Sequence, residues 1–292
     1  MSGLSAPPPR RACLSVPASS QRKLAKATGL GADEIVVDLE DAVVTAAKAE
    51  ARSAAVSTLR DGDGVTPVAV RVNAPRSPWC HEDLVALASL EAQPRSVVVP
   101  KVESAGDIAF VERLLDGAEA AAGRAAPLRV QALIETAAGL ARVDEIAASS
   151  RRLESLILGY ADLGAALGGD RSLDAWAPAQ HALLLAARAH GLQAIDGPHL
   201  GVAVDDAFHA GARRAVELGF DGKWAIHPSQ VAPLVAAFTP STEEIAHAEA
   251  VCAALDRAER DGTGAVELEG EMLDEAMRMR ALGVLARASG AT

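Results

Sequence analysis

The stretch SVVVPKVESAGDIAFVERLLDGAEAAAGRAAPLRVQALIE (residues 96–135) decides the fold. It opens with an apolar, β-branched run that ends at Lys101, and it closes with a second apolar run that ends at Glu135. Between them, apolar residues recur every three or four positions until a glycine, which is typical of a helix and its stop signal. The stretch therefore predicts two strands joined by a helix, and strands joined in this way run parallel.

The same unit repeats along the whole chain. Apolar runs occur at ACLSVP (12–17), EIVVDLED (34–41), VAVRVN (68–73), SVVVPK (96–101), LRVQALIE (128–135), LESLILGYAD (153–162), LQAIDG (192–197) and GKWAIHP (222–228). Alanine-rich amphipathic stretches such as QRKLAKATGLGA and WAPAQHALLLAARAHG lie between them. Eight such α/β units close naturally into a (β/α)8 TIM barrel rather than an open sheet. No G-x-G-x-x-G follows the first run, which weakens the dinucleotide-binding alternative.

A short extension follows the eighth run. A chain of 292 residues can hold one large barrel with an appendage or two ordinary domains, and the regular runs favour the barrel. We expect residues 1–10 to be a disordered lead-in, residues 11–240 to form the barrel, and residues 241–292 to form a C-terminal helical extension. Because this extension is too small for a core of its own, we expect a lid or an oligomer contact.

Composition excludes several classes of partner and compartment. A formal charge of −11 with dispersed basic residues argues against nucleic-acid and anionic-membrane binding, which need clustered Lys and Arg. No run approaches the length of a membrane span. Cys13, Cys80 and Cys252 form no CxxC pair, so neither a disulfide framework nor a cysteine zinc site is indicated. A reducing cytoplasm is the simplest compartment.

Nearly every apolar run ends in a polar or charged residue. These residues are Asp38, Glu40, Asp41, Arg71, Asn73, Lys101, Glu135, Asp162, Asp196 and His227. A parallel barrel collects the carboxyl ends of its strands around one mouth, where catalytic residues belong. His227 is either a base or a hydrogen-bonded structural residue. Core strands have no packing reason to end repeatedly in ionisable groups, so the pattern predicts an enzyme.

Glu135 and Asp162 form the sharpest pair of candidate ligands. Each directly follows an apolar run, and the two runs are neighbours in the predicted barrel. Two carboxylates so close repel each other unless one takes a proton or a divalent cation lies between them. Oxygen ligands with open positions suit magnesium or manganese. The structural alternative is that Glu135 caps the following helix and that Asp162 pairs with an arginine.

Arg71 lies in a β-branched run, where a guanidinium needs an anionic partner. A substrate carboxylate or carbonyl is the functional partner, and an ion pair with Asp38 or Glu40 is the structural one; both interpretations can hold together. Asp41 is either catalytic or a helix N-cap. Lys101 either orients the metal-binding glutamate or neutralises the acidic cluster.

Seven motifs resemble one known family. DLEDAV, RVN, VVPKVES, ALIETAAGL, LGYADLGAALG, AIDGPH and GFDGKWAIHPSQV, in this order, are similar to the citrate lyase β-subunit-like proteins of the superfamily that also contains the 2-oxo-acid aldolases. The resemblance covers about residues 10–240. It implies a magnesium-dependent barrel, with manganese possible, that makes or breaks the carbon–carbon bond of a 3-hydroxyacyl thioester such as malyl-, citramalyl- or citryl-CoA. Glu135 and Asp162 match the family's metal ligands, and Arg71 matches its substrate-binding arginine.

Two further positions refine the resemblance. The 2-oxo-acid aldolases carry a histidine where this chain has only DLEDAV, which favours CoA thioesters. The tail resembles the longer malyl-CoA and citramalyl-CoA lyases, in which a helical segment covers the active site of an adjacent subunit and contributes an acidic residue; Asp274 matches it. On periodicity alone, Asp274 is a solvated surface residue. The resemblance implies a homo-oligomer, a trimer or a hexamer.

The expected site follows from these matches. We assign Asp274 and Asp41 to catalysis, Arg71, Glu135, Lys101 and Glu40 to substrate binding, and Glu135 and Asp162 to the metal. The expected substrates are a CoA thioester and a 2-oxo acid. A metal-dependent 2-oxo-acid aldolase, a citrate lyase subunit that acts on an acyl-carrier protein, a thioesterase and a non-catalytic CoA-ester-binding barrel remain as alternatives.

Overall fold

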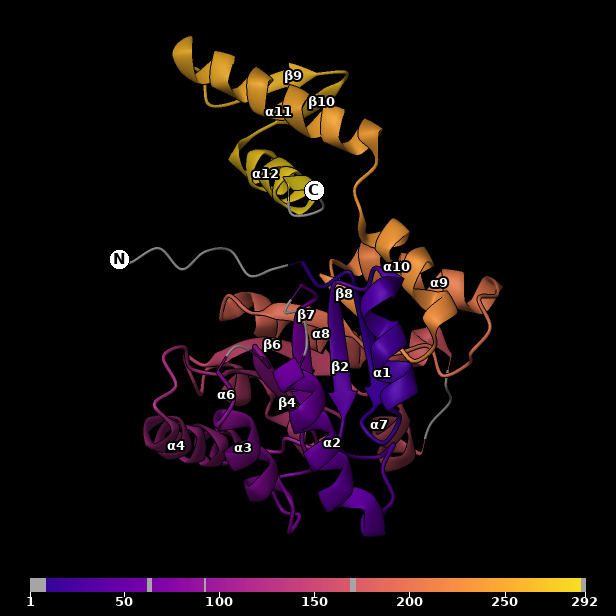
Figure 1. Ribbon diagram of the computed structural model, residues 1–292. Coiled ribbons are helices and arrows are strands. Elements are labelled where there is room, and N and C mark those ends of the chain that lie inside the picture. Colours follow the sequence, from indigo (N-terminus) through magenta and orange to yellow (C-terminus); the bar gives the residue numbers. More distant parts are fainter. Residues whose placement is uncertain (1–8, 62–64, 92, 169–171, 290–292) are drawn as a thin grey trace. The chain divides into compact units, whose positions relative to one another are not determined.

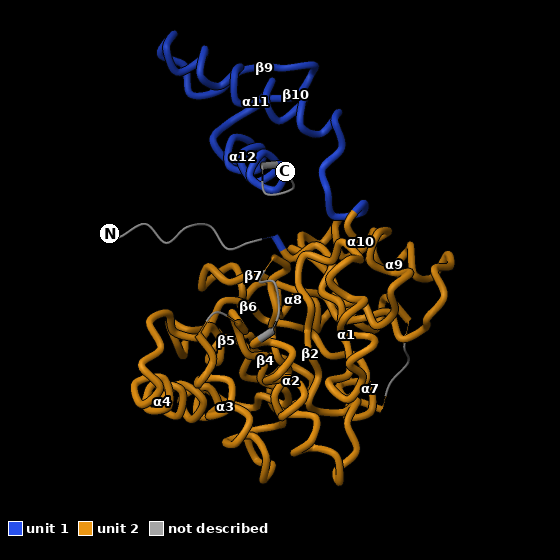
Figure 2. Tube along the Cα trace, in the orientation of Figure 1, with its two compact units in different colours: residues 1–9, 236–292 blue, residues 10–235 orange. Residues whose placement is uncertain are grey.

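The computed structural model describes residues 9–61, 65–91, 93–168 and 172–289. Residues 1–8 of the expected lead-in lie outside this part. The chain divides into two compact units (Figure 2). The large unit contains residues 10–235, and the small unit contains the residues from Ala236 onward together with the first nine residues of the chain. Each unit is described by itself below.

Eight parallel strands form a closed barrel in chain order, as the sequence predicts (Figure 1). The strands are β1 (Ala12–Pro17), β2 (Glu34–Asp38), β3 (Val68–Arg71), β4 (Ser96–Val99), β5 (Arg129–Ile134), β6 (Leu153–Leu158), β7 (Gln193–Asp196) and β8 (Gly222–Ala225). Strand β1 pairs with both β2 and β8, which closes the sheet. The (β/α)8 barrel is therefore confirmed.

Helices surround the strands of this unit (Figure 1). They are α1 (Gln21–Ala27), α2 (Lys48–Asp61), α3 (Cys80–Ala88), α4 (Ala105–Ala122), α5 (Ala137–Ala141), α6 (Val143–Ala147), α7 (Tyr160–Leu167), α8 (Leu173–Ala189), α9 (Asp206–Leu218) and α10 (Val231–Phe238). The stretch that decided the fold behaves as predicted: a capping box of Ser104 and Asp107 starts α4, and Gly123 ends it in the left-handed conformation. No described helix is both long and apolar enough to cross a membrane.

The middle of the barrel is apolar. Successive strand residues point to opposite faces, and the register pairs Val36 with Ala69 and Leu133 with Ile157. The central core cluster contains one residue from each strand: Cys13, Val36, Ala69, Val98, Leu133, Ile157, Ile195 and Trp224. This layer makes the interior a packed core rather than a pore.

A polar network closes the amino end of the barrel. Arg10, which the sequence places in the lead-in, is 2% exposed, and its Nε donates to Glu34 Oε1 at 3.0 Å. Its other guanidinium nitrogens bond to Gln193 and Glu154. Gln131 Nε2 donates to Glu34 Oε2 at 3.0 Å. The expectation of disorder is therefore wrong for Arg10, because buried carboxylates hold its guanidinium.

The small unit contains α11 (Thr242–Arg260), β9 (Val266–Leu268), β10 (Glu271–Leu273) and α12 (Glu275–Ser289). The glycine-containing break forms a hairpin, whose two turn residues, Glu269 and Gly270, both have positive φ, at 52° and 88°. The unit also has a buried apolar cluster of its own: Ala248, Val251, Ala254, Leu255, Leu273 and Ala281. The premise that this segment cannot form a core is therefore wrong, since the hairpin strand packs its apolar residue between the two helices.

Candidate active site

Seven of the strand-end residues singled out in the sequence gather at the carboxyl end of the barrel. Asp38 and Arg71 are the last residues of β2 and β3. The others follow β2, β4, β5 and β6: Glu40, Asp41, Lys101, Glu135 and Asp162. Ion pairs through Arg71 and Lys101 link all of these carboxylates. The strands thus bring residues more than a hundred positions apart, from Asp38 to Asp162, into one cluster. This is the arrangement expected when the carboxyl ends of barrel strands share one mouth.

Arg71 is held by two hydrogen bonds to one carboxylate. Its Nε donates to Asp38 Oδ1 at 2.8 Å, and its Nη2 donates to Asp38 Oδ2 at 2.6 Å. Its Nη1 lies 3.0 Å from Glu40 Oε2 and 3.5 Å from Asp41 Oδ2. Burial lowers the pKa of Arg71, but the bonds and the negative charge of Asp38 outweigh it and raise the pKa. The structural partner predicted for Arg71 is present, and Nη1 is the part of the guanidinium nearest the remaining carboxylates.

Lys101 connects the acidic cluster to the expected metal ligands. Its backbone N–H donates to Glu135 Oε1 at 2.9 Å, and its Nζ lies 2.9 Å from Asp162 Oδ2. The ammonium also bonds to Glu40. Burial lowers the pKa of Lys101, but the bonds to Glu40 and Asp162 outweigh it, so the pKa lies above its ordinary value. Lys101 therefore both orients the glutamate and neutralises the cluster.

Glu135 is the most strongly perturbed carboxylate of the mouth. Its side chain is buried, and burial raises its pKa to about 8, while Lys101 partly offsets this and Glu40 adds to it. Gly159, directly after β6, leaves room for the Glu135 side chain. A Cβ at residue 159 would lie 2.5 Å from Glu135 Cβ and 2.8 Å from Glu135 Oε2, which is too close. Sequence reasoning missed Gly159; the signal is a glycine between an apolar run and the first carboxylate after it.

The structural alternatives predicted for the carboxylates are mostly absent. Thr136, not Glu135, caps the next helix by accepting from Gly139 N at 3.0 Å. Asp162 pairs with Lys101 rather than with an arginine. Asp41 caps no helix and is exposed at the mouth. The predicted roles of Glu135 and Asp162 as metal ligands and of Asp41 in catalysis therefore remain predictions.

Other strand-end residues have structural partners. Asn73 Nδ2 donates to Asp83 Oδ2 at 2.7 Å, and the same oxygen accepts from the Asn73 backbone N–H. The ring of His227 accepts from the Ser229 N–H at 3.3 Å and caps a short 3-10 helix. His227 thus has the structural role that the sequence left open.

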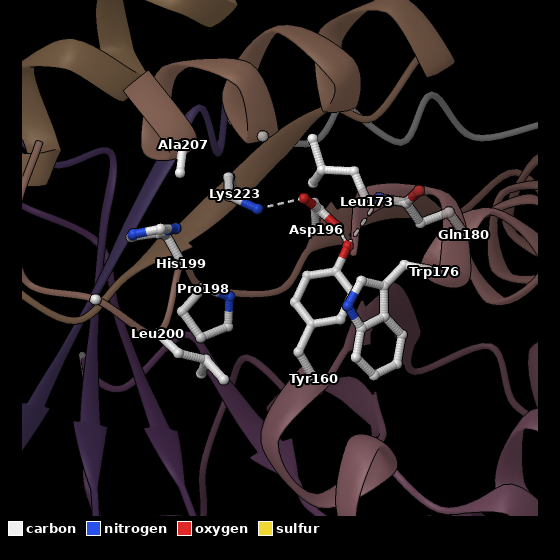
Figure 3. A pocket seen from close by; sticks show the side chains of 12 residues that line it. Tyr160, Leu173, Trp176, Gln180, Asp196, Pro198, His199, Leu200, Ala207 and Lys223 are labelled. Atoms are coloured by element: carbon white, nitrogen blue, oxygen red, sulfur yellow. Dashed lines mark hydrogen bonds and ion pairs between the residues drawn. The ribbon is translucent and has the colours of Figure 1, made fainter. Parts of the chain in front are cut away.

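Asp196 does not point into the barrel. Its strand neighbour Ile195 belongs to the central core, so Asp196 points outward, where it bonds to Tyr160 and Lys223 (Figure 3). These residues line a cavity of about 200 Å³ beside α8 and α9, whose wall includes Trp176. Both oxygens of Asp196 accept a hydrogen bond, from Tyr160 and from Lys223, and the Lys223 ammonium also donates to the Gly197 carbonyl oxygen. The cavity lies outside the barrel, separate from the carboxylate cluster at the mouth.

The chemistry of the mouth fits a magnesium ion. Two buried carboxylate oxygens, Glu40 Oε2 and Asp162 Oδ2, lie in ion pairs, with Arg71 Nη1 at 3.0 Å and Lys101 Nζ at 2.9 Å, but accept no hydrogen bond of standard geometry. Glu135 directly follows β5, and Asp162 lies in the first turn of α7, after the neighbouring β6. Both supply hard oxygen ligands, and magnesium commonly uses one or two protein carboxylates and keeps several waters. Among the described residues, no group of three or more Asp, Glu, His or Cys side chains forms a ready cation cage. The residues therefore suit an ion that leaves positions open for substrate oxygens.

Asp274 belongs to the small unit and lies at the start of α12. Its Oδ1 accepts from the backbone N–H groups of Ala276 at 2.9 Å and Met277 at 3.2 Å. The carboxylate is exposed and caps the helix. Its catalytic assignment stays a prediction.

Comparison with known proteins identifies the family. The family model described as HpcH/HpaI aldolase/citrate lyase matches residues 11–228, which is most of the chain. The chain belongs to this family. The resemblance inferred from the seven motifs is thus confirmed, and the matched residues of this HpcH/HpaI family member include every site residue except Asp274.

Characterised family members match almost the whole chain. An L-malyl-CoA/beta-methylmalyl-CoA lyase of Cereibacter sphaeroides is 38% identical, over 92% of each chain. A (3S)-malyl-CoA thioesterase of the same species is 37% identical, over 96% of this chain and 95% of the relative. The CitE protein of Mycobacterium tuberculosis, solved with magnesium, acetoacetate and coenzyme A, is 34% identical with a TM-score of 0.78, over 97% and 99% of the two chains. A citrate lyase of Burkholderia xenovorans gives a TM-score of 0.85 at 26% identity, over 98% and 92%.

Proposed function

We propose that this protein is a magnesium-dependent carbon–carbon lyase that cleaves or forms a 3-hydroxyacyl-CoA thioester, such as malyl-, citramalyl- or citryl-CoA. The products of cleavage are an acyl-CoA and a 2-oxo acid. The observation that carries the proposal is the convergence of Glu135, Asp162 and Arg71 at one barrel mouth. The lyase and citrate lyase relatives, and the magnesium in the CitE structure, support it.

Glu135 and Asp162 would hold the metal. A bound magnesium ion supplies Lewis acidity, which polarises the carbonyl that forms as the carbon–carbon bond breaks. Arg71 would hold the substrate carboxylate through Nη1, because Asp38 already engages its Nε and Nη2. Glu40 and Lys101, which form an ion pair beside these residues, would also contact the substrate.

Two protons must move during cleavage. The substrate hydroxyl loses its proton as the bond breaks, and the acyl carbon of the thioester half gains one. Asp41 is our candidate for accepting the hydroxyl proton, since it is exposed at the mouth beside Lys101. Asp274 is our candidate for the proton transfer at the acyl carbon. Condensation follows the same path in reverse.

A substrate panel tests the proposed reaction. The full chain with magnesium is incubated with malyl-, citramalyl- and citryl-CoA and with 4-hydroxy-2-oxo acids, while the 2-oxo acid, the acyl-CoA and free CoA thiol are measured separately. We expect a 2-oxo acid and an acyl-CoA in equal amounts from a CoA thioester. Cleavage of the 4-hydroxy-2-oxo acids alone would instead identify a CoA-independent aldolase.

Thioester hydrolysis is the second candidate, because one relative of similar identity is a malyl-CoA thioesterase. The same panel separates the two activities. A lyase leaves the thioester intact, whereas a thioesterase releases free CoA thiol without forming a new 2-oxo acid.

We also propose that residues 241–292 act as a lid on an adjacent subunit of a homo-oligomer, a trimer or a hexamer. Four large apolar side chains of this segment are exposed: Met272, Met277, Met279 and Leu282. Such a surface suits a protein contact. A lid would exclude water from a reactive enolate.

Subunit mixing tests whether Asp274 acts between chains. Asp274→Ala and Glu135→Ala proteins, each expected to be inactive, are mixed under conditions of verified subunit exchange. Part of the activity should return, because some mouths then receive an intact metal site from one chain and an intact Asp274 from another. Without recovery, Asp274 acts within its own chain or only caps α12.

The cytoplasm is the compartment we propose for this enzyme. The cysteines Cys13, Cys80 and Cys252 are all free, which suits a reducing environment. The net charge of −11 supports small-molecule substrates rather than nucleic acid or a membrane surface.

A further inference from the structure

Lys101 adopts a backbone conformation that non-glycine residues rarely take. Its φ is 53°, in the left-handed region, which is sterically unfavourable for any residue with a β-carbon. The conformation has a specific result, because it turns the Lys101 N–H onto Glu135 Oε1 at 2.9 Å. Backbone strain of this kind persists where the surroundings enforce it, often at functional sites. The residue after β4 is therefore fixed relative to one expected metal ligand.

The side chain of Lys101 reaches the other ligand. Its Nζ lies 2.9 Å from Asp162 Oδ2 and 4.0 Å from Glu135 Oε1. On its other side, the ammonium bonds to Glu40 and lies 3.6 Å from Asp41 Oδ1. One ammonium group therefore stands between the two expected metal ligands and a second pair of carboxylates.

We propose that Lys101 is a tethered counter-ion that pairs with Asp162 beside Glu135 before the metal binds, and that it leaves Asp162 and keeps only its contacts with Glu40 and Asp41 when a divalent cation enters. The inference rests on the proposed function, because it takes Glu135 and Asp162 as the metal ligands. What it adds is that the ammonium of Lys101 competes with the divalent cation for the carboxylates.

The geometry makes simultaneous occupancy unfavourable. Magnesium binds carboxylate oxygens at about 2.1 Å. An ammonium 2.9 Å from the same Asp162 oxygen would then be close to a doubly charged ion, and like charges at that separation repel strongly. Glu40 and Asp41 are within reach of the flexible lysine stem without any movement of the backbone, so the ammonium has a second partner ready.

The same ammonium also explains how the carboxylates of the mouth stay together before the metal binds. Without a positive charge nearby, the carboxylates of Glu40 and Asp162 would repel each other. The ammonium provides a positive charge among them, and the strained N–H keeps Glu135 Oε1 in place. The cost is weaker metal binding than the bare carboxylates would give.

Magnesium binding to the wild type and two variants tests the inference. Metal-stripped full-length protein is titrated with magnesium chloride by isothermal calorimetry, in the wild type and in Lys101→Met, which keeps the apolar stem but removes the charge. Arg76→Met is the matched control, because it also removes one positive charge, but from an exposed side chain whose ion-pair partner is Glu103, at 3.5 Å. We expect Lys101→Met to bind magnesium on the order of tenfold more tightly and Arg76→Met to bind as the wild type does.

Thermal unfolding provides a second readout. Without metal, Lys101→Met should melt at a lower temperature than the wild type, because its carboxylates lose their counter-ion. Saturating magnesium should raise its melting temperature by more than it raises that of the wild type. In a crystal structure with magnesium, Lys101 Nζ should have left Asp162 for Glu40 or Asp41.

Three outcomes would overturn the inference, and they are distinguishable. If the wild type binds magnesium but Lys101→Met binds it equally or more weakly, Lys101 orients the ligands and does not compete. If Nζ still contacts Asp162 in the magnesium-bound crystal structure, the movement is wrong. If the wild type binds no magnesium, the metal site itself is wrong, and the proposed function fails with it.

Discussion

The two ends of the barrel hold buried charges in opposite ways. At the amino end, Glu34 accepts hydrogen bonds from Arg10 and from Gln131. Gln131 in turn donates to Ser96 Oγ at 2.8 Å and accepts from Ser155 Oγ at 3.0 Å. Each of these side chains has a partner, so the network forms a closed layer beneath the apolar core.

The mouth buries more charged side chains than the amino end, and it holds some of their oxygens by ion pairs alone. Among the described residues, the two buried carboxylate oxygens without a hydrogen bond, on Glu40 and Asp162, both lie at this end. Glu135 has a pKa raised to about 8, chiefly by burial. Burial of charge alone therefore does not mark a site. Carboxylate oxygens held by ion pairs alone, a raised carboxyl pKa and a strained lysine do, because folding alone gives no reason to keep them.

The largest expected effect comes from removing a metal ligand at the mouth. Glu135→Ala or Asp162→Ala should lower turnover by about three orders of magnitude or more, because the Lewis acid is lost. The midpoint of urea unfolding should change little, since neither side chain builds the core. Steady-state kinetics and calorimetric magnesium titration check both points. Full activity of Glu135→Ala in a chelator would contradict the metal site.

The amino end should respond in the reverse way. Glu34→Ala leaves Arg10 buried with part of its counter-charge removed, which should lower the free energy of unfolding by about 3–5 kcal/mol. Turnover per folded molecule should stay near that of the wild type. Urea unfolding with activity corrected for the folded fraction measures both, and exposed Glu50→Ala serves as the control. A loss of turnover as large as that at the mouth would remove the distinction between the ends.

Arg71→Lys should have an intermediate effect. The lysine keeps the charge but loses the planar fork that engages Asp38 and, in our proposal, the substrate carboxylate. We expect kcat/KM to fall by at least about tenfold, with magnesium affinity close to that of the wild type. Unchanged kinetics would show that Arg71 only pairs with Asp38.

The smallest effect should be on the pH dependence of stability. Glu135 keeps its proton in the folded protein up to about pH 8, whereas in the unfolded chain it loses the proton near its ordinary pKa of about 4.3. Between these values the folded state binds more protons, so metal-free stability should fall as pH rises. Glu135→Gln should remove this part of the slope. Melting temperatures of both proteins from pH 5 to 9 in chelator measure the difference, and parallel curves would contradict the raised pKa.

Most of the fold and the location of the site follow from local sequence pattern. The period of apolar residues distinguishes strands from helices, and strand–helix alternation requires parallel strands. Parallel strands in a barrel share one carboxyl end, so Glu135 and Asp162 were predictable as neighbours from their positions after two consecutive runs. The family motifs lie at the same strand ends, which is why they identified the family.

Only the tertiary structure decided which charges pair. The sequence left Arg71 with three possible partners, placed Asp196 at the mouth and assigned Arg10 to a disordered lead-in. The observed partners are Asp38 for Arg71, an outward ion pair with Lys223 for Asp196, and Glu34 for Arg10. Such pairings join residues tens of positions apart, and they depend on strand register and side-chain direction, which local periodicity does not encode. The strain at Lys101 and the small core of the C-terminal unit have the same origin, because each results from contacts between segments rather than from the segments themselves.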